Sequence, residues 1–244
     1  IRKIFKHEKE IFTQMFYGSK FYTKIIDFIN SIRSSLAKNA LVLLKEIFSE
    51  YIPEYDEKNQ KNNIIPVLKI AIPALLSKIN SNQIFIKKEV KICLDTIVKN
   101  MKYGDCLLCL IQQMNIGKNP IEENAYELSI ELITNIGKEN LIKMNQFNDI
   151  IKCIVNYYDG DKNLRKKKTF DLLKKLKEVI EEKDFNGLIE KTGKKDVINN
   201  ILLLKGLSKK IKKCPSSVNH LRNNVKKSKT RRSTLFSFSD TTEE

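Results

Sequence analysis

The sequence has no tryptophan and few glycines, prolines and histidines. Its 244 residues include 8 Gly, 5 Pro and 2 His. Scarce Gly and Pro argue against a turn-rich β-sandwich and favour helices, because both residues interrupt regular elements. The two histidines, His7 and His220, are isolated, so a Cys–His or Ser–His nucleophilic arrangement has little support.

Long apolar runs are also missing. The longest stretch without a charge runs from Cys106 to Gly117, whereas a bilayer-spanning helix needs about 20 apolar residues. The sequence therefore predicts no membrane span. The cysteines number five, and this odd count without a signal peptide indicates a reducing compartment.

No motif in the sequence indicates catalysis. Cys106 and Cys109 form a C-x-x-C pair, but they lie in an apolar helical run without a second cysteine pair. This favours core positions over a metal or redox site. We therefore expect a protein that is not an enzyme and that uses no cofactor, no metal and no small-molecule substrate.

Positive charge is concentrated near the end of the chain. Lys and Arg number 45 against 29 Asp and Glu, a formal net charge of +16. Residues 205–232 hold eleven bases and no acid, whereas residues 233–244 hold three acids and no base. Such a chain prefers acidic partners: an acidic protein surface, nucleic acid or an anionic membrane.

An apolar anchor followed by a helix-spaced apolar pattern recurs four times. The anchors are Ile32, Ile86, Ile121 and Leu164, which are 54, 35 and 43 residues apart. A base directly follows three of them, as Arg33, Lys87 and Arg165. Helix pairs with an irregular period of this length are typical of HEAT or armadillo repeats, in which stacking buries the face that each pair alone would expose.

Each of these helices follows another apolar helix and a short polar corner. The expected first helices are 16–29, 64–79, 103–114 and 147–158, and the corners are 30–31, 80–83, 115–120 and 159–163. The pattern predicts an all-α fold, an α-solenoid of HEAT-like helical hairpins (an armadillo-type superhelix), over residues 1–213. A basic, Ser/Thr-rich tail, expected to be disordered, covers residues 214–244.

The corners and the helices after them resemble one known family. The stretches that carry the resemblance are SIRSSLAKNALVLLKEIF (31–48), SNQIFIKKEV (81–90), DKNLRKKKTFDLL (161–173) and DFNGLIEKTGKKDV (184–197). Their order and spacing are similar to those of TOG domains, and closest to the CLASP and TOGARAM (crescerin) branch. The resemblance implies that residues 1–6 end a truncated first repeat.

The resemblance implies a flat TOG paddle of HEAT repeats that binds tubulin or microtubules along one edge and regulates microtubule assembly or stability. It also implies a place in the cytoplasm and cytoskeleton, including the cilium, flagellum or basal body. The matching tubulin-binding residues are Ser31, Arg33, Asn82, Phe85, Lys87, Lys118, Lys162 and Arg165. Glu122 stands where the family has a base after the anchor, and Lys118 is the nearest replacement.

Other interpretations of the same residues stay open. The bases could be solvated charges at helix starts, and Phe85 could pack between repeats. A generic HEAT scaffold that binds an acidic peptide or protein would also fit the pattern. A nucleic-acid binder that acts through the basic tail ranks below both.

Overall fold

The chain is helical throughout the part that the structure describes. This computed structural model describes the backbone of residues 7–52, 64–158 and 163–211, with side chains up to residue 203. These residues form eleven α-helices and two π-helical turns, without a β-strand. The predicted all-α class is therefore confirmed.

The helices follow one another with short connections. The α-helices are α2 (Lys9–Thr13), α3 (Phe21–Ile29), α4 (Ser34–Glu46), α6 (Ile64–Lys78), α7 (Ile84–Asn100), α8 (Gly104–Ile116), α9 (Ile121–Lys143), α10 (Phe147–Tyr158), α11 (Asn163–Ile180), α12 (Glu182–Lys191) and α13 (Lys195–Ile211). The π-helical turns are η1 (Gln14–Gly18) and η2 (Ile47–Tyr51).

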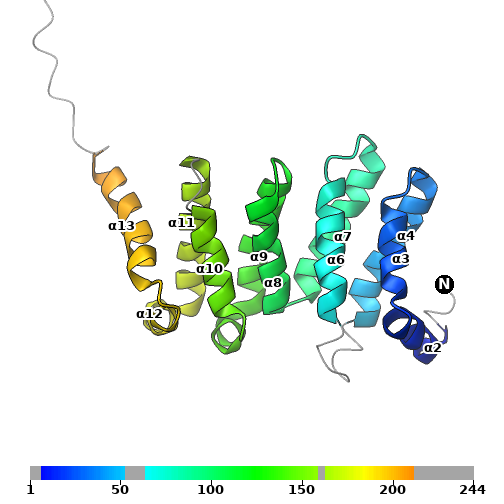
Figure 1. Cartoon of the computed structure of the whole chain (residues 1–244), viewed down its shortest axis with the longest axis horizontal. Coiled ribbons are helices and arrows are strands. Elements are labelled where there is room, and N and C mark those ends of the chain that lie inside the picture. The colour runs from blue at the N-terminus through cyan, green and yellow to red at the C-terminus, as the bar shows by residue number, and fades with distance from the viewer. Residues whose placement is uncertain (1–6, 53–63, 159–162, 212–244) are drawn as a thin grey trace, which may run out of the picture. The chain divides into compact units, whose positions relative to one another are not determined.

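Consecutive helices form pairs, and the pairs pack side by side in two layers (Figure 1). The first layer holds α3, α6, α8 and α10, each in contact with the next. The second layer holds α4, α7, α9 and α11, again each in contact with the next. Each pair thus adds one helix to each layer, and the apolar faces meet between the layers, where one continuous core is buried.

One predicted helix is divided in the structure, and α9 contains a break after the end of its predicted pattern. The helix expected over 16–29 is interrupted at Lys20, whose left-handed φ of 51° separates η1 from α3. Gly137 interrupts α9 with a φ of 75°. Glycine adopts this conformation without the clash that a Cβ would bring. Residues 138–143 therefore turn away from the first part of α9 before α10 begins.

Two asparagine side chains join neighbouring helices of the second layer. Asn100 of α7 donates a hydrogen bond to the carbonyl oxygen of Phe48 at 3.1 Å. Asn135 of α9 donates one to the carbonyl oxygen of Val98 at 3.3 Å. Each bond runs from a side chain of one helix pair to the backbone of the preceding pair. The two bonds therefore help to fix the position of each pair relative to the one before it.

The chain divides by its contacts into residues 1–206 and residues 207–244. The predicted boundary between residues 213 and 214 and the predicted tail lie outside the described residues, as do residues 1–6. Within the described ranges, no helix has the length and apolar character that crossing a bilayer would require.

Replacing Ala40 by leucine should destabilise the helix pairs. Ala40 is buried in α4, which packs against both α3 and α7. Added carbons in a close-packed interior force neighbours out of place, at a cost of roughly 1–3 kcal/mol. Thermal unfolding followed by circular dichroism measures the change. The matched control is Asn39→Leu, since Asn39 is the exposed neighbour of Ala40. Equal melting temperatures for both variants would contradict the packing of α4.

Candidate protein-binding edge

The turns within the helix pairs lie along one edge of residues 1–206, at the top of Figure 1. The described turns join α3 to α4 (30–33), α6 to α7 (79–83) and α8 to α9 (117–120). At the same edge α10 ends and α11 begins, although residues 159–162 between them lie outside the described residues. We call the three described turns, together with the first turns of α4, α7, α9 and α11, the corner edge.

The first two corners share one local geometry. The backbone N–H of Arg33 donates to Ser31 Oγ at 3.2 Å, and that of Gln83 donates to Ser81 Oγ at 3.3 Å. The corners therefore correspond at a spacing of 50 residues. The structural counterpart of Arg33 is Gln83, and Lys87 lies one helical turn further on, inside α7.

The anchor spacing of 54 between the first two repeats is consequently wrong by one helical turn. Ile32 is exposed before α4 begins, whereas Ile86 is buried within α7. Apolar residues recur every three or four positions along a helix, so the pattern fits almost as well after a shift of four residues. Periodicity alone could not set the register.

Most of the predicted binding residues face solvent. Phe85 is exposed, as are four polar or basic residues, Arg33, Asn82, Lys87 and Lys118. None of these four side chains forms a hydrogen bond or ion pair with another described residue. Ser31 is partly buried, and its hydroxyl accepts the backbone bond described above. Lys162 lies outside the described residues.

Phe85 has one side in the protein and another in solvent. Its side chain is 40% exposed at the start of α7. The ammonium of Lys38, on α4 of the preceding pair, lies 6.0 Å from the centre of the ring. Phe85 is therefore in contact with the neighbouring pair and still offers apolar surface at the corner edge.

Large apolar side chains are exposed along the corner edge, which the sequence pattern did not reveal. The exposed fraction is 99% for Ile32, 84% for Ile84 and 49% for Leu164, and it is 75% for Ile116, the last residue of α8 directly before the third corner. The repeat pattern includes Ile32 and Leu164 as anchors, because it does not distinguish a residue beside a helix start from one on a buried face. Exposed apolar side chains that gather in one region mark interaction sites more often than single scattered ones do.

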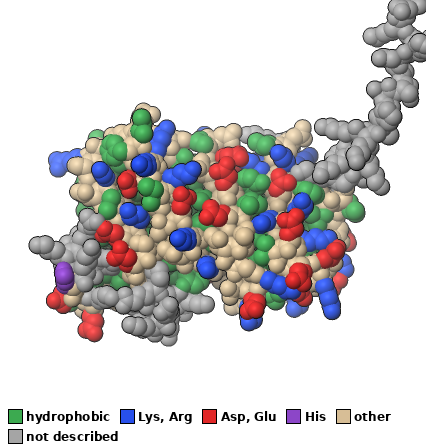
Figure 2. Space-filling view, turned by 180° about the vertical axis from the view of Figure 1, so that it is seen from behind, with side chains coloured by type: hydrophobic (Ala, Val, Ile, Leu, Met, Phe, Trp, Pro, Cys, Tyr) green, Lys and Arg blue, Asp and Glu red, His purple; other side chains and the backbone are tan. Residues whose placement is uncertain are grey.

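Positive charge accompanies these apolar side chains. Residues 28–38, 78–88 and 163–170 at the corner edge contain Lys or Arg but no Asp or Glu. At the third corner, residues 113–121 contain Lys118 and no acid, but the first turn of α9 then adds Glu122 and Glu123. Figure 2 shows basic and hydrophobic side chains together at the upper left, where the corners before α4 and α7 lie. Residues 159–162 differ in sequence, because they read Asp-Gly-Asp-Lys.

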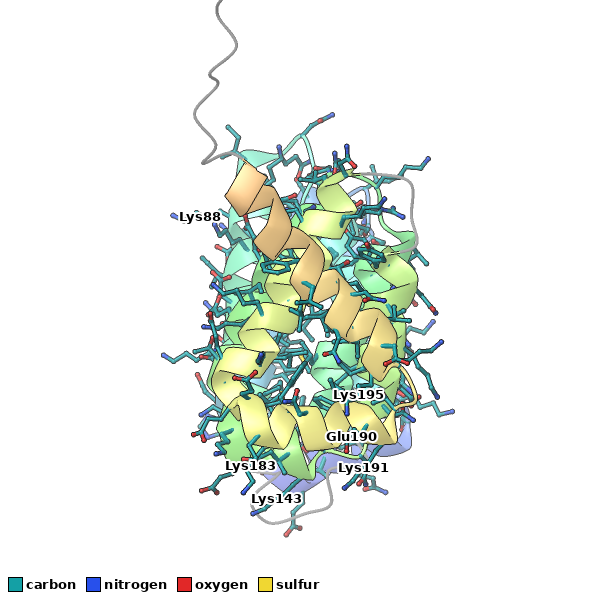
Figure 3. All side chains as sticks on the ribbon, turned by 90° about the vertical axis from the view of Figure 1, so that its left-hand side faces the viewer. Lys88, Lys143, Lys183, Glu190, Lys191 and Lys195 are labelled. Carbon is teal, nitrogen blue, oxygen red and sulfur yellow. The ribbon has the colours of Figure 1, made fainter. Side chains whose placement is uncertain are left out.

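The opposite edge of the helix pairs carries charges of both signs. Lys88 lies toward the corner edge, whereas Lys143 lies at the opposite edge (Figure 3). At that edge Glu190 is paired with Lys195. A pocket of about 310 Å³ is also found at the opposite edge, lined in part by Lys102 and Lys143. This edge therefore offers exposed lysines that serve as controls for those of the corner edge.

A buried charge cluster lies where α9, α10 and α11 meet. Glu122, in the first turn of α9, is only 4% exposed. Its carboxylate accepts hydrogen bonds from the Tyr157 hydroxyl at 2.5 Å and from Lys168 Nζ at 3.0 Å. Arg165 Nη2 lies 3.5 Å from the same carboxylate. Lys168, itself buried, also contacts the carboxylate of Glu123 at 2.5 Å.

Arg165 is therefore held by the protein, unlike the exposed bases of the other corners. Its guanidinium carbon lies 5.1 Å from the centre of the Tyr157 ring, and its side chain is 23% exposed. In the sequence, Glu122 stands at a position where the resemblance implies a base. In the structure it binds the base of the next helix pair, and no spacing in the sequence indicated this.

The environment of Glu122 keeps its carboxyl ionised. Burial by itself raises the pKa of this group, but hydrogen bonds from Tyr157 and Lys168 and the charges of Lys168 and Arg165 bring the pKa below its ordinary value. Burial and the bond to Glu122 raise the pKa of the Tyr157 hydroxyl. At neutral pH the hydroxyl is therefore a donor and the carboxylate an acceptor.

The cysteine pair lies in the core. Cys106 and Cys109 are buried free thiols of α8, and burial raises the pKa of Cys109 to about 11. Within the described residues, no group of three or more His, Cys, Asp or Glu side chains is placed to hold a metal ion.

Comparison with protein-family models and with curated proteins gives no match for this chain.

Proposed function

We propose that residues 1–213 form a TOG-type α-solenoid of HEAT-like pairs that binds tubulin through the corner edge. In this proposal the protein regulates microtubule assembly or stability and catalyses no reaction. One observation carries the proposal: exposed basic and exposed apolar side chains recur at successive corners, on the same edge. If these helix starts had only a structural role, Ile32 and Ile84 would not need to be exposed to solvent.

The two kinds of side chain would act at different stages of binding. The bases that form no ion pair within the described residues, such as Arg33 and Lys118, would draw an acidic surface toward the edge and orient it. The apolar groups would then be desolvated against the partner and supply most of the affinity, as buried anchors in interfaces generally do. The basic tail would add avidity for an acidic microtubule lattice.

Binding to tubulin should survive removal of the tail. Pull-down with free tubulin and co-sedimentation with microtubules, each for residues 1–244 and 1–213, test this. The proposal expects the shorter chain to bind, with the tail adding salt-sensitive affinity. If only the longer chain binds, and nucleic acid competes equally well, the tail alone is responsible and the corner edge is not a tubulin site.

A further inference from the structure

We propose that Glu122 is a positioning residue of the corner edge, which holds the guanidinium of Arg165 in one orientation toward a carboxylate of the partner. The inference rests on the proposed function, because it treats the corner edge as the binding surface. It gives a role to a buried acid at a position where the sequence indicated only the loss of a base.

Arg165 is restrained on two sides. Its Nη2 lies 3.5 Å from Glu122, and its guanidinium lies over the Tyr157 ring. The side chains of Arg33 and Lys118, by contrast, contact no charged group among the described residues. A guanidinium that is already ordered loses less conformational freedom when a partner binds, so each of its hydrogen bonds contributes more affinity.

Arg165 also retains unused hydrogen-bonding capacity. A guanidinium has five N–H donors, and the contact with Glu122 involves Nη2. Nε of Arg165 is buried and has no hydrogen-bond partner among the described residues, so the donors that a partner could reach are on the terminal nitrogens. Part of the side chain remains open to solvent at the corner edge. The planar arrangement of donors suits a carboxylate, which can accept two parallel bonds.

Lys168 does not share this role. It is buried and contacts both Glu122 and Glu123, so its charge is satisfied inside the cluster. The cluster therefore contains two carboxylates and two cations, and it adds no net positive charge to the edge. Arg165 therefore contributes oriented hydrogen-bond donors to binding more than long-range electrostatic attraction.

Because the cluster adds no net charge, the two explanations predict opposite changes in the affinity for tubulin. If the edge attracts tubulin only through diffuse charge, removing any carboxylate should strengthen binding. If Glu122 positions Arg165, Glu122→Gln should weaken binding even though it makes the edge more positive. Glutamine keeps the shape of the side chain and an oxygen for Tyr157, but it removes the charge that holds the guanidinium.

The experiment measures the affinity of the full chain for tubulin, at equal ionic strength, for Glu122→Gln and for Glu123→Gln. Glu123 is the neighbouring acid; it contacts Lys168 but not Arg165, which makes it a matched control. We expect Glu122→Gln to weaken binding roughly 3- to 30-fold and Glu123→Gln to leave it unchanged or slightly stronger. Arg165→Lys, which keeps the charge and loses the planar donors, should resemble Glu122→Gln.

Two outcomes would overturn the inference. One is a gain in affinity for Glu122→Gln that equals the gain for Glu123→Gln. The other is an undiminished effect of Glu122→Gln in an Arg165→Gln background, because the effect would then not pass through Arg165.

A readout without tubulin separates this inference from the proposed function. The NMR signal of the Arg165 Nε–H group should differ from that of the wild type in Glu122→Gln and should match it in Glu123→Gln. If the wild-type chain binds no tubulin, the proposed function fails, and this signal still decides whether Glu122 orders Arg165. An unchanged signal in Glu122→Gln would refute the positioning role.

Discussion

The triple variant Arg33→Glu, Lys87→Glu, Lys118→Glu should lose tubulin binding and keep its helicity and melting temperature. The three bases come from three helix pairs, and their side chains form no ion pair within the described residues. A single exposed charge contributes about 0–1 kcal/mol, but a reversed charge also repels an acidic partner. Because sites without shared partners add nearly independently, the combined loss should exceed roughly 100-fold.

Arg165 is left out of this variant on structural grounds. A carboxylate at that position would face Glu122, and like charges at close range would destabilise the fold. Loss of binding could then follow from unfolding. Lys118 replaces it, since its side chain is exposed and reversing its charge disturbs no internal contact.

The control reverses three exposed lysines toward the opposite edge, Lys99, Lys102 and Lys143. It changes the net charge by the same amount, and Figure 3 shows Lys143 at the end of the molecule away from Lys88. The control variant should bind tubulin nearly as well as the wild type. Equal weakening by the two triple variants would mean that net charge alone governs binding, and the corner edge would lose its assignment.

The helix pairs were predictable because their signals are local. Apolar residues at helical spacing marked α6, α8 and α10 almost to their ends, and the polar corners between the helices are short. Breaks within helices were harder to foresee. The repeated apolar pattern of α9 ends at Ile136, yet the helix resumes after Gly137, which takes a left-handed conformation.

The candidate site was predictable only in part, and the reason is geometric. Arg33 and Lys118 are exposed at corners, as expected, because polar residues near a helix start usually face solvent. The pairing of Lys87 with Arg33 was wrong by one turn, since a helical period does not fix its own origin. The exposed Ile32 and Ile84 escaped notice because apolar residues are assigned to the core by default.

The buried cluster around Glu122 could not be read from the sequence at all. Its members lie on three helices, with Tyr157 35 residues and Lys168 46 residues from Glu122 along the chain. Spacing rules for ion pairs apply within one helix. They give no information on a carboxylate of α9 that meets a lysine of α11 only once the pairs have packed.

Replacing Glu122 by leucine should lower the stability of the domain by about 3–5 kcal/mol, the usual effect of removing one partner of a buried ion pair. The change leaves Lys168 buried with only Glu123 to contact, and it leaves the Tyr157 hydroxyl without its acceptor. Urea unfolding near neutral pH measures the loss. Glu123→Leu is the matched control and should have a much smaller effect, because Glu123 is about half exposed.

The loss of stability caused by Glu122→Leu should depend on pH. Because the folded pKa of Glu122 lies below its ordinary value of 4.5, the carboxylate stabilises the fold above that value, and this contribution disappears as pH falls through the folded pKa. The difference in stability between wild type and Glu122→Leu should therefore shrink when unfolding is repeated near pH 3.

The double variant Glu122→Leu, Lys168→Met should recover much of the lost stability at neutral pH, since apolar groups of similar size can replace a buried ion pair at little cost. If the double variant is as unstable as Glu122→Leu alone, the buried lysine is not the source of the penalty, and the ion pair does not join α9 to α11 in the way that its geometry indicates.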